Sequence, residues 1–185
     1  MFSGKTAKLV EEYGDGKGVL AFRPDIDKRY GDEARIYSKI KGINCPAVLI
    51  SYKDPGVILR IVNESKQEIQ RIIVDEVSFF EITVFLKVVE QLTERGVRIV
   101  VGGLDYDANR IPWGPTLALT GIPGVEEIVL TSRCDGEEGL CPEEAIWSYR
   151  KVANQKRLVV KGEEMYGAAC EKHYLELHHK PRGKK

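Results

Sequence analysis

The chain has 185 residues, 43% of them hydrophobic, which is enough for one domain with a core and a small appendage. Its 28 basic and 28 acidic residues cancel, which argues against a nucleic-acid-binding protein, because such proteins usually carry a basic excess. It has neither an apolar run of roughly 20 residues for a membrane span nor a signal-peptide layout, so we expect a cytoplasmic protein with reduced cysteines.

The first residues match the end of a phosphate-binding loop, G-x-x-x-x-G-K-[ST], and fill its last positions with Ser3, Gly4, Lys5 and Thr6. In such a loop backbone amides surround the phosphates, the lysine reaches the β and γ oxygens, and the hydroxyl holds Mg²⁺. A helix is predicted over 6–13, with the positive end of its dipole at the loop. The alternative is that these residues only begin a helix.

A complete loop of this kind needs a preceding strand and a first glycine, and neither precedes Met1 in the sequence. We therefore expect Met1 to be an internal methionine of the phosphate loop, with a reading frame that begins upstream. Mass spectrometry of the native N-terminus would test this expectation.

Apolar periodicity predicts an α/β fold further along the chain. Short runs rich in β-branched residues predict buried strands of a parallel sheet covered on both faces, at 19–22, 72–74, 97–101 and 127–130. Apolar residues at spacings of three and four predict a helix over 80–95, which Gly96 ends. A shorter helix is predicted over 65–71. Strands that alternate with helices indicate an α/β domain.

The predicted strand at 72–74 ends in two carboxylates, Asp75 and Glu76. Ligand sites of parallel sheets lie at the carboxyl ends of the strands. At that place Asp75 can hold the Mg²⁺ of a nucleotide, and Glu76 can accept the proton of an attacking hydroxyl. The alternative is a pair of solvated charges at a strand end. Because the pair follows a G-K-T sequence, we favour nucleotide binding.

The character of the sequence changes near Thr131, where a stretch rich in Gly, Glu and Cys begins. We predict three parts: an α/β nucleotide-binding domain over 1–130 that lacks its first strand, a small β-rich subdomain over 131–176, and a basic, disordered tail over 177–185.

Five segments, in the same order along the chain, resemble the small zinc-containing thymidine kinases of bacteria, archaea and animals. They are Met1–Thr6 (family G-P-M-F-S-G-K-T), Asp25–Tyr30 (I-D-x-R-Y), Asp75–Phe80 (D-E-x-Q-F-F), Gly103–Gly114 (G-L-D-x-x-F-x-x-x-P-F-G) and Gly162–His173 (G-G-x-E-x-Y followed by C-x-x-C/H). The resemblance runs from residue 1 to about 175. It implies a P-loop-type parallel sheet flanked by helices, with a C-terminal zinc-binding lasso subdomain.

The resemblance also implies an activity, namely transfer of the γ-phosphate of ATP to the 5′-hydroxyl of a deoxynucleoside, expected to be thymidine, by a homotetramer or dimer. Lys5, Arg29 and Glu76 would be catalytic, with Glu76 as the general base. ATP and Mg²⁺ would be held by Ser3, Gly4, Lys5, Thr6, Asp27 and Asp75. The nucleoside would be held by Phe80, Leu104, Trp113, Val160, Gly162 and Tyr166. For Phe80 and Trp113 the alternative role is core packing.

Three cysteines and a histidine form a candidate zinc site, because structural zinc takes four N or S ligands in a tetrahedron. The ligands would be Cys134, Cys141, Cys170 and His173. The resembling family usually has C-x-x-C for the first pair, whereas six residues separate Cys134 from Cys141 here. We expect a structural ion that ties the base of the loop closing over the nucleoside. The alternative is a set of unlinked thiols.

Two of the departures from the family pattern bear on the substrate: Ser78 replaces a Gln, and Ala108 replaces an aromatic residue. The loss of an aromatic wall removes about 1–3 kcal/mol of burial and stacking, so we expect a changed base preference or weak activity. Two other functions remain open. One is a catalytically weakened relative that binds nucleotide as a regulator, and the other is a zinc-ribbon nucleic-acid module.

Overall fold

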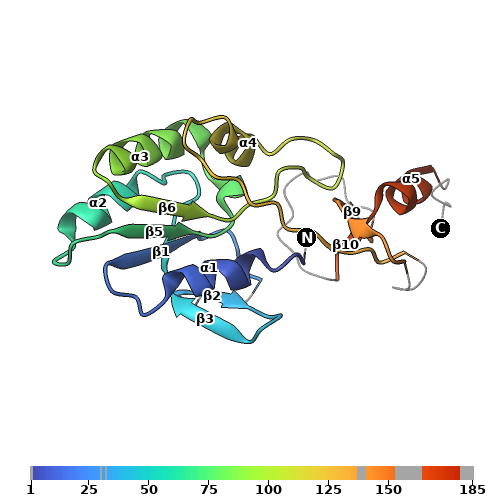
Figure 1. The fold of residues 1–185 in the computed structure, drawn as a ribbon, viewed down its shortest axis with the longest axis horizontal. Helices are drawn as coiled ribbons and strands as arrows, with labels where there is room; N and C mark the ends of the chain where they lie inside the picture. Colours follow the sequence, from blue (N-terminus) through green and yellow to red (C-terminus); the bar gives the residue numbers. More distant parts are fainter. Residues whose placement is uncertain (1, 30, 32, 137–140, 153–163, 180–185) are drawn as a thin grey trace. The chain divides into compact units, whose positions relative to one another are not determined.

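The computed structural model describes residues 2–29, 31, 33–136, 141–152 and 164–179 (Figure 1). The chain divides into two compact units, which are described separately. The sheet unit comprises Gly4–Asp105 and Trp113–Glu127, and the cysteine unit comprises Met1–Ser3, Tyr106–Pro112 and Ile128–Lys185. The 106–112 segment thus groups with the C-terminal part of the chain, which the sequence patterns did not indicate.

Four parallel strands form the sheet of the sheet unit, in the order β4 (Val48–Ile50), β1 (Val19–Pro24), β5 (Arg71–Val74) and β6 (Arg98–Val101). Leu20 of β1 pairs with Ile72 of β5, which pairs in turn with Ile99 of β6. The strands are short and mostly apolar, as strands covered on both faces require. The predicted α/β fold with a parallel sheet is confirmed.

Both faces of this sheet are covered (Figure 1). One face packs against α1 (Lys5–Tyr13) and the antiparallel hairpin of β2 (Arg35–Ser38) and β3 (Ile43–Pro46). The other face packs against α2 (Val57–Glu64), α3 (Ile82–Glu94) and α4 (Gly114–Thr120). The larger core lies on this second side, and its fully buried side chains include Phe22, Ile58, Val74, Phe85 and Leu92.

Helix α3 illustrates why the sequence folds as it does. The Glu81 carboxylate accepts hydrogen bonds from the backbone N–H groups of Thr83 and Val84 and so caps the first turn. Apolar residues at helical spacing then face the core. After the last turn Gly96 adopts φ 77°, a left-handed conformation that suits glycine at a helix end. Among the described helices, none is long and apolar enough to cross a membrane.

Two predicted elements are wrong. The helix expected over 65–71 lies earlier, as α2, because the Ser65 hydroxyl bonds the backbone of Gln67 and ends the helix at Glu64. The strand expected over 127–130 is irregular chain with no neighbouring strand among the described residues. Val129 there is 73% exposed, so β-branched composition alone did not make a strand.

Among its described residues, the cysteine unit contains two short antiparallel strand pairs and a helix. β9 (Trp147–Arg150) pairs antiparallel with β10 (Tyr166–Ala169), and β7 (Ser132–Arg133) pairs antiparallel with β8 (Glu144–Ala145). Helix α5 (Glu171–His179) follows directly. The first residues of the expected disordered tail, 177–179, therefore belong to a helix, and 180–185 lie outside the described residues.

Candidate functional site

The residues that the sequence predicts as the end of a phosphate loop lie at the start of α1. Gly4 precedes the helix at φ 84°, a left-handed conformation that glycine adopts without a steric penalty. Its carbonyl accepts a hydrogen bond from Lys8 N at 3.1 Å, which closes the first turn. The backbone N–H groups of this turn have no helical carbonyl to bond, so they are available for an anion. Lys5 and Thr6 follow directly on the same turn.

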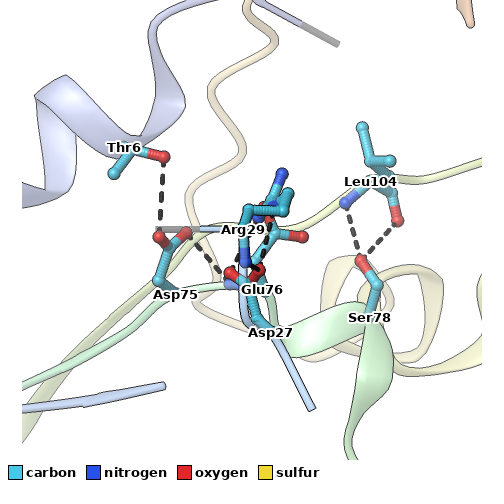
Figure 2. Close-up of polar contacts among 7 residues, drawn as sticks. All are labelled: Thr6, Asp27, Arg29, Asp75, Glu76, Ser78 and Leu104. Atoms are coloured by element: carbon cyan, nitrogen blue, oxygen red, sulfur yellow. Dashed lines mark hydrogen bonds and ion pairs between the residues drawn. The ribbon is translucent and has the colours of Figure 1, made fainter. Parts of the chain in front are cut away.

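Asp75, at the carboxyl end of β5, lies against this helix start (Figure 2). The hydroxyl of Thr6 donates to Asp75 Oδ2 at 3.5 Å, and Glu76 N donates to Asp75 Oδ1 at 3.0 Å. Burial, followed by repulsion from Glu76, raises the pKa of Asp75 to about 7, although the charges of Arg29 and Lys5 oppose this rise. A divalent cation at this hydroxyl and carboxylate would favour the charged form.

Arg29 joins two carboxylates (Figure 2). Its Nε and Nη2 donate to the two oxygens of Asp27 at 2.8 and 2.9 Å, and Nη2 also donates to Glu76 Oε1 at 2.5 Å. Burial alone would lower the pKa of Arg29, but attraction to Glu76 and Asp27 raises it overall. Burial likewise opposes ionisation of Asp27, yet bonding to Arg29 lowers the pKa of this carboxyl below its usual value.

Glu76 has an unusual backbone conformation, with φ 52° and ψ 42°. The left-handed region costs a residue with a Cβ about 1–2 kcal/mol. The strain ends β5 abruptly and leads into the short 3₁₀ helix η1 (Val77–Phe79). The side chain is buried beside Arg29. Strained, buried carboxylates of this kind gather at functional sites.

Ser78 fixes the neighbouring loop. Its Oγ accepts a hydrogen bond from Leu104 N at 2.7 Å and donates one to Leu104 O at 3.1 Å (Figure 2). The same Oγ lies 3.1 Å from Thr116 Oγ1. Gly103 fits beside it because a Cβ there would lie 2.6 Å from Thr116 Oγ1 and 2.8 Å from Val77 Cγ1. The serine that departs from the family pattern is therefore an integral part of the packing around Leu104.

Two adjacent phenylalanines have different surroundings. Phe80 is buried in the core and stacks on Phe85 with ring centroids 5.7 Å apart. Phe79 is half-buried and meets the Trp113 ring edge-on at 5.8 Å. Phe79 thus contacts Trp113, one of the residues predicted to bind the nucleoside. The sequence does not distinguish Phe79 from Phe80, so only the structure reveals this contact. The nucleoside-binding role of Phe80 stays a prediction.

The remaining predicted nucleoside residues belong to the cysteine unit. Tyr166 is buried in β10, and the guanidinium of Arg150 lies 5.8 Å from the centre of its ring. Val160 and Gly162 lie outside the described residues. Ala108, where the family pattern has an aromatic residue, is buried, and its carbonyl accepts a hydrogen bond from Tyr174 Oη at 3.0 Å.

The predicted zinc ligands come together in the cysteine unit. One ligand atom from each of Cys134, Cys141, Cys170 and His173 lies within 4.8 Å of all the others, and all four residues are buried. His173 Nδ1 is 3.3 Å from the Sγ atoms of both Cys134 and Cys170. Sulfur ligands of a tetrahedral zinc ion lie about 3.8 Å apart, so the four residues fit the ion. The wider first spacing does not prevent this clustering.

The surroundings of Cys134 favour its thiolate form. Burial opposes ionisation of Cys134, but N–H groups of Cys170 and Gly136 and the ring of His173 outweigh it and lower the pKa to about 7. The two backbone donors lie 3.2 and 3.3 Å from the sulfur. Thiolates are the form in which cysteines bind metal. The four cysteines of the chain are all free of disulfides.

A sequence model of the thymidine kinase family matches residues 1–174 of this chain. The thymidine kinase of Mycoplasma capricolum is 32% identical over 188 residues, which cover 95% of this chain and 85% of that protein. The thymidine kinase of Mesomycoplasma hyopneumoniae is 30% identical over 182 residues, with 92% and 88% covered. That of Bacteroides fragilis is 29% identical over 178 residues, with 94% and 82% covered. The chain therefore belongs to the thymidine kinase family.

Proposed function

We propose that this protein transfers the γ-phosphate of ATP to the 5′-hydroxyl of thymidine. One observation carries the proposal: Thr6 at the start of α1, Asp75 and Glu76 at the end of β5, and Arg29 form one connected set of contacts. Phosphoryl transfer depends mainly on positioning and charge neutralisation, and this set offers a hydroxyl, carboxylates and a cation at one strand end.

The phosphate side of the site would be formed by the start of α1. The amides that follow Ser3 and Gly4 would bond phosphate oxygens, and Lys5 would neutralise charge on the transferred group. Thr6 and Asp75 would hold Mg²⁺, which when bound reduces the negative charge of the phosphates. Asp27 would keep the guanidinium of Arg29 in place by its two hydrogen bonds.

Glu76 would act as the general base. It would accept the proton of the 5′-hydroxyl as the bond from that oxygen to the γ-phosphorus forms and the bond from the γ-phosphorus to the leaving ADP oxygen breaks. Before substrates bind, the Glu76 carboxylate forms an ion pair with Arg29. During transfer Arg29 would turn from Glu76 toward the phosphates.

The nucleoside would lie against Leu104 and Trp113, and we add Phe79 to this group because its half-buried ring contacts Trp113. Tyr166, Val160 and Gly162 would complete the contacts from the cysteine unit, and Phe80 would support them from the core. Zinc at the cysteine cluster would be structural. We further propose a cytoplasmic homotetramer or dimer.

The test is an ADP-release assay with the full chain, ATP, Mg²⁺ and a panel of deoxynucleosides. We expect release that depends on thymidine, that is lost in Glu76→Gln, and that is retained in Glu94→Gln, a matched change at an exposed position on α3. A folded, zinc-loaded protein that binds ATP but releases no ADP with any nucleoside would contradict the proposal and favour a nucleotide-binding relative.

A further inference from the structure

The segment 106–112, called here the 106–112 loop, is a closed turn. At its neck Trp113 N donates to Asp105 O at 2.7 Å, and Tyr106 forms a β-bridge with Pro112. Inside it, Asp107 Oδ1 accepts from Asn109 N at 2.8 Å and from Ile111 N at 2.9 Å. In the sequence the loop directly joins Leu104–Asp105 to Trp113.

Arg110, at the tip of the loop, is held on several sides. Its guanidinium carbon lies 4.1 Å from the ring centres of both Trp147 and Tyr174. Its Nη2 donates to Glu171 Oε1 at 2.8 Å, and Trp147 Nε1 donates to the other oxygen of the same carboxylate. We call these four residues the Arg110 clasp.

The backbone of Arg110 is strained. Arg110 has φ 61°, and a residue with a Cβ adopts this conformation at a cost of about 1–2 kcal/mol. Asn or Gly would suit such a turn better. The arginine is retained in this conformation by its ring and carboxylate contacts, together with the hydrogen bond from Tyr174 Oη to Ala108 O at 3.0 Å.

Each partner of Arg110 adjoins the cysteine cluster. Glu171 directly follows the ligand Cys170, and Tyr174 directly follows the ligand His173 on α5. Trp147 of β9 pairs with Ala169 of β10, the residue before Cys170. An ion at the cluster would therefore order the first turn of α5 and, with it, the groups that hold Arg110.

We propose that Arg110 is a positioning residue that couples the Cys₃His cluster to Leu104 and Trp113, and thereby sets nucleoside affinity without touching the nucleoside. This inference rests on the proposed function for its catalytic readout only. It predicts that damage to the clasp weakens thymidine binding and leaves ATP binding unchanged.

The experiment compares wild type with Arg110→Met, which keeps an aliphatic side chain and removes the charge. The control is Arg95→Met, which removes an exposed arginine whose Nη2 bonds Asn63 Oδ1 in the sheet unit. Hydrogen exchange of the 106–112 peptide, zinc content, and KM for thymidine and for ATP are measured. We expect Arg110→Met to keep its zinc, to exchange about tenfold faster in this peptide, and to raise the thymidine KM about tenfold. The KM for ATP should stay within about twofold, because no phosphate-side residue belongs to the clasp.

Unchanged exchange in Arg110→Met, or a KM increase shared equally by ATP and thymidine, would overturn the inference. If wild type does not phosphorylate thymidine, the proposed function fails, and the exchange measurement still decides whether Arg110 holds the loop. If Arg110→Met does not fold, Arg110→Lys and Glu171→Gln replace it. Both should speed exchange of the same peptide by smaller factors, and unaltered exchange in both would equally reject the coupling.

Discussion

Removal of the guanidinium at position 29 is the most informative single change in the sheet unit. The Arg29 side chain is 16% exposed, and its partners Asp27 and Glu76 are 3% and 8% exposed. Arg29→Met removes three side-chain hydrogen bonds and leaves two buried carboxylates without their cation, beside the third carboxylate of Asp75. Breaking a buried pair in this way costs about 3–5 kcal/mol.

The loss of stability in Arg29→Met should appear in urea and thermal unfolding followed by circular dichroism. For a chain of this size it corresponds to a drop in Tm of about 10 °C. The control is Arg98→Met, because Arg98 is 58% exposed in its ion pair with Glu12. An exposed pair contributes at most about 1 kcal/mol, so this variant should unfold nearly as wild type does.

The pH dependence of the free energy of unfolding, compared between wild type and Arg29→Met, gives a sharper test. In wild type, Arg29 lowers the pKa of Asp27, so the pairing stabilises the fold above the unfolded pKa of about 3.9 and is lost as the pH falls further. In Arg29→Met burial would raise the pKa of Asp27, with only the charge of Arg23 left to oppose it, so the folded state should take up a proton as the pH falls from 8 to 5. The deficit relative to wild type should shrink over that range. A deficit below about 1 kcal/mol at pH 7, or one that does not change with pH, would refute this reasoning.

Three further predictions concern the site and its frame. Glu76→Gln should lower kcat about 10²–10⁴-fold, because it removes the proposed base and keeps the side-chain size. ADP release measures kcat, and titration calorimetry should show little change in ATP affinity. A kcat within tenfold of wild type would exclude Glu76 as the base. Gly103→Ala should lower the free energy of unfolding by about 1–3 kcal/mol, because the new Cβ would lie 2.6 Å from Thr116 Oγ1. The control Gly114→Ala has nothing within 4 Å of its Cβ, so its free energy of unfolding should stay close to that of wild type. Equal effects of the two substitutions would contradict the packing argument. A strong chelator should release one zinc per chain and expose the β9–β10 hairpin to hydrogen exchange, and Cys141→Ser should bind zinc more weakly; full zinc affinity in Cys141→Ser would remove it from the ligand set.

Local signals are sufficient to predict the strands β1, β5 and β6 and the helices α1 and α3, but they do not predict β4 at the edge of the sheet. Helix α3 has a capping carboxylate at Glu81, regular apolar spacing and Gly96. Helix α2 was missed because Ser65 ends it just where a pattern-based helix was expected to begin. The 127–130 run looked like a strand, but a strand needs a neighbour, and that information is not local.

In the candidate site, too, some features could be predicted from local sequence and others depend on tertiary contacts. The Cys₃His set and the acidic pair after β5 could be predicted from motif positions, whereas the pairing of Arg29 with Glu76 depends on a tertiary contact between residues 47 positions apart. The distinction between Phe79 and Phe80 depends on the direction of one turn, η1, which places one ring toward Trp113 and the other in the core. The grouping of the 106–112 loop with the cysteine unit depends on Arg110 meeting two rings far along the chain.

The tight surroundings of Ser78 limit how this position can be exchanged among relatives. A glutamine introduced here would need space now taken by Thr116, whose hydroxyl lies 3.1 Å from Ser78 Oγ. The exchange would also remove the hydroxyl that accepts the hydrogen bond of Leu104 N. The single substitution Ser78→Gln is therefore expected to destabilise the fold. Among relatives, positions 78 and 116 should covary, with a residue smaller than threonine at 116 wherever a glutamine occupies 78.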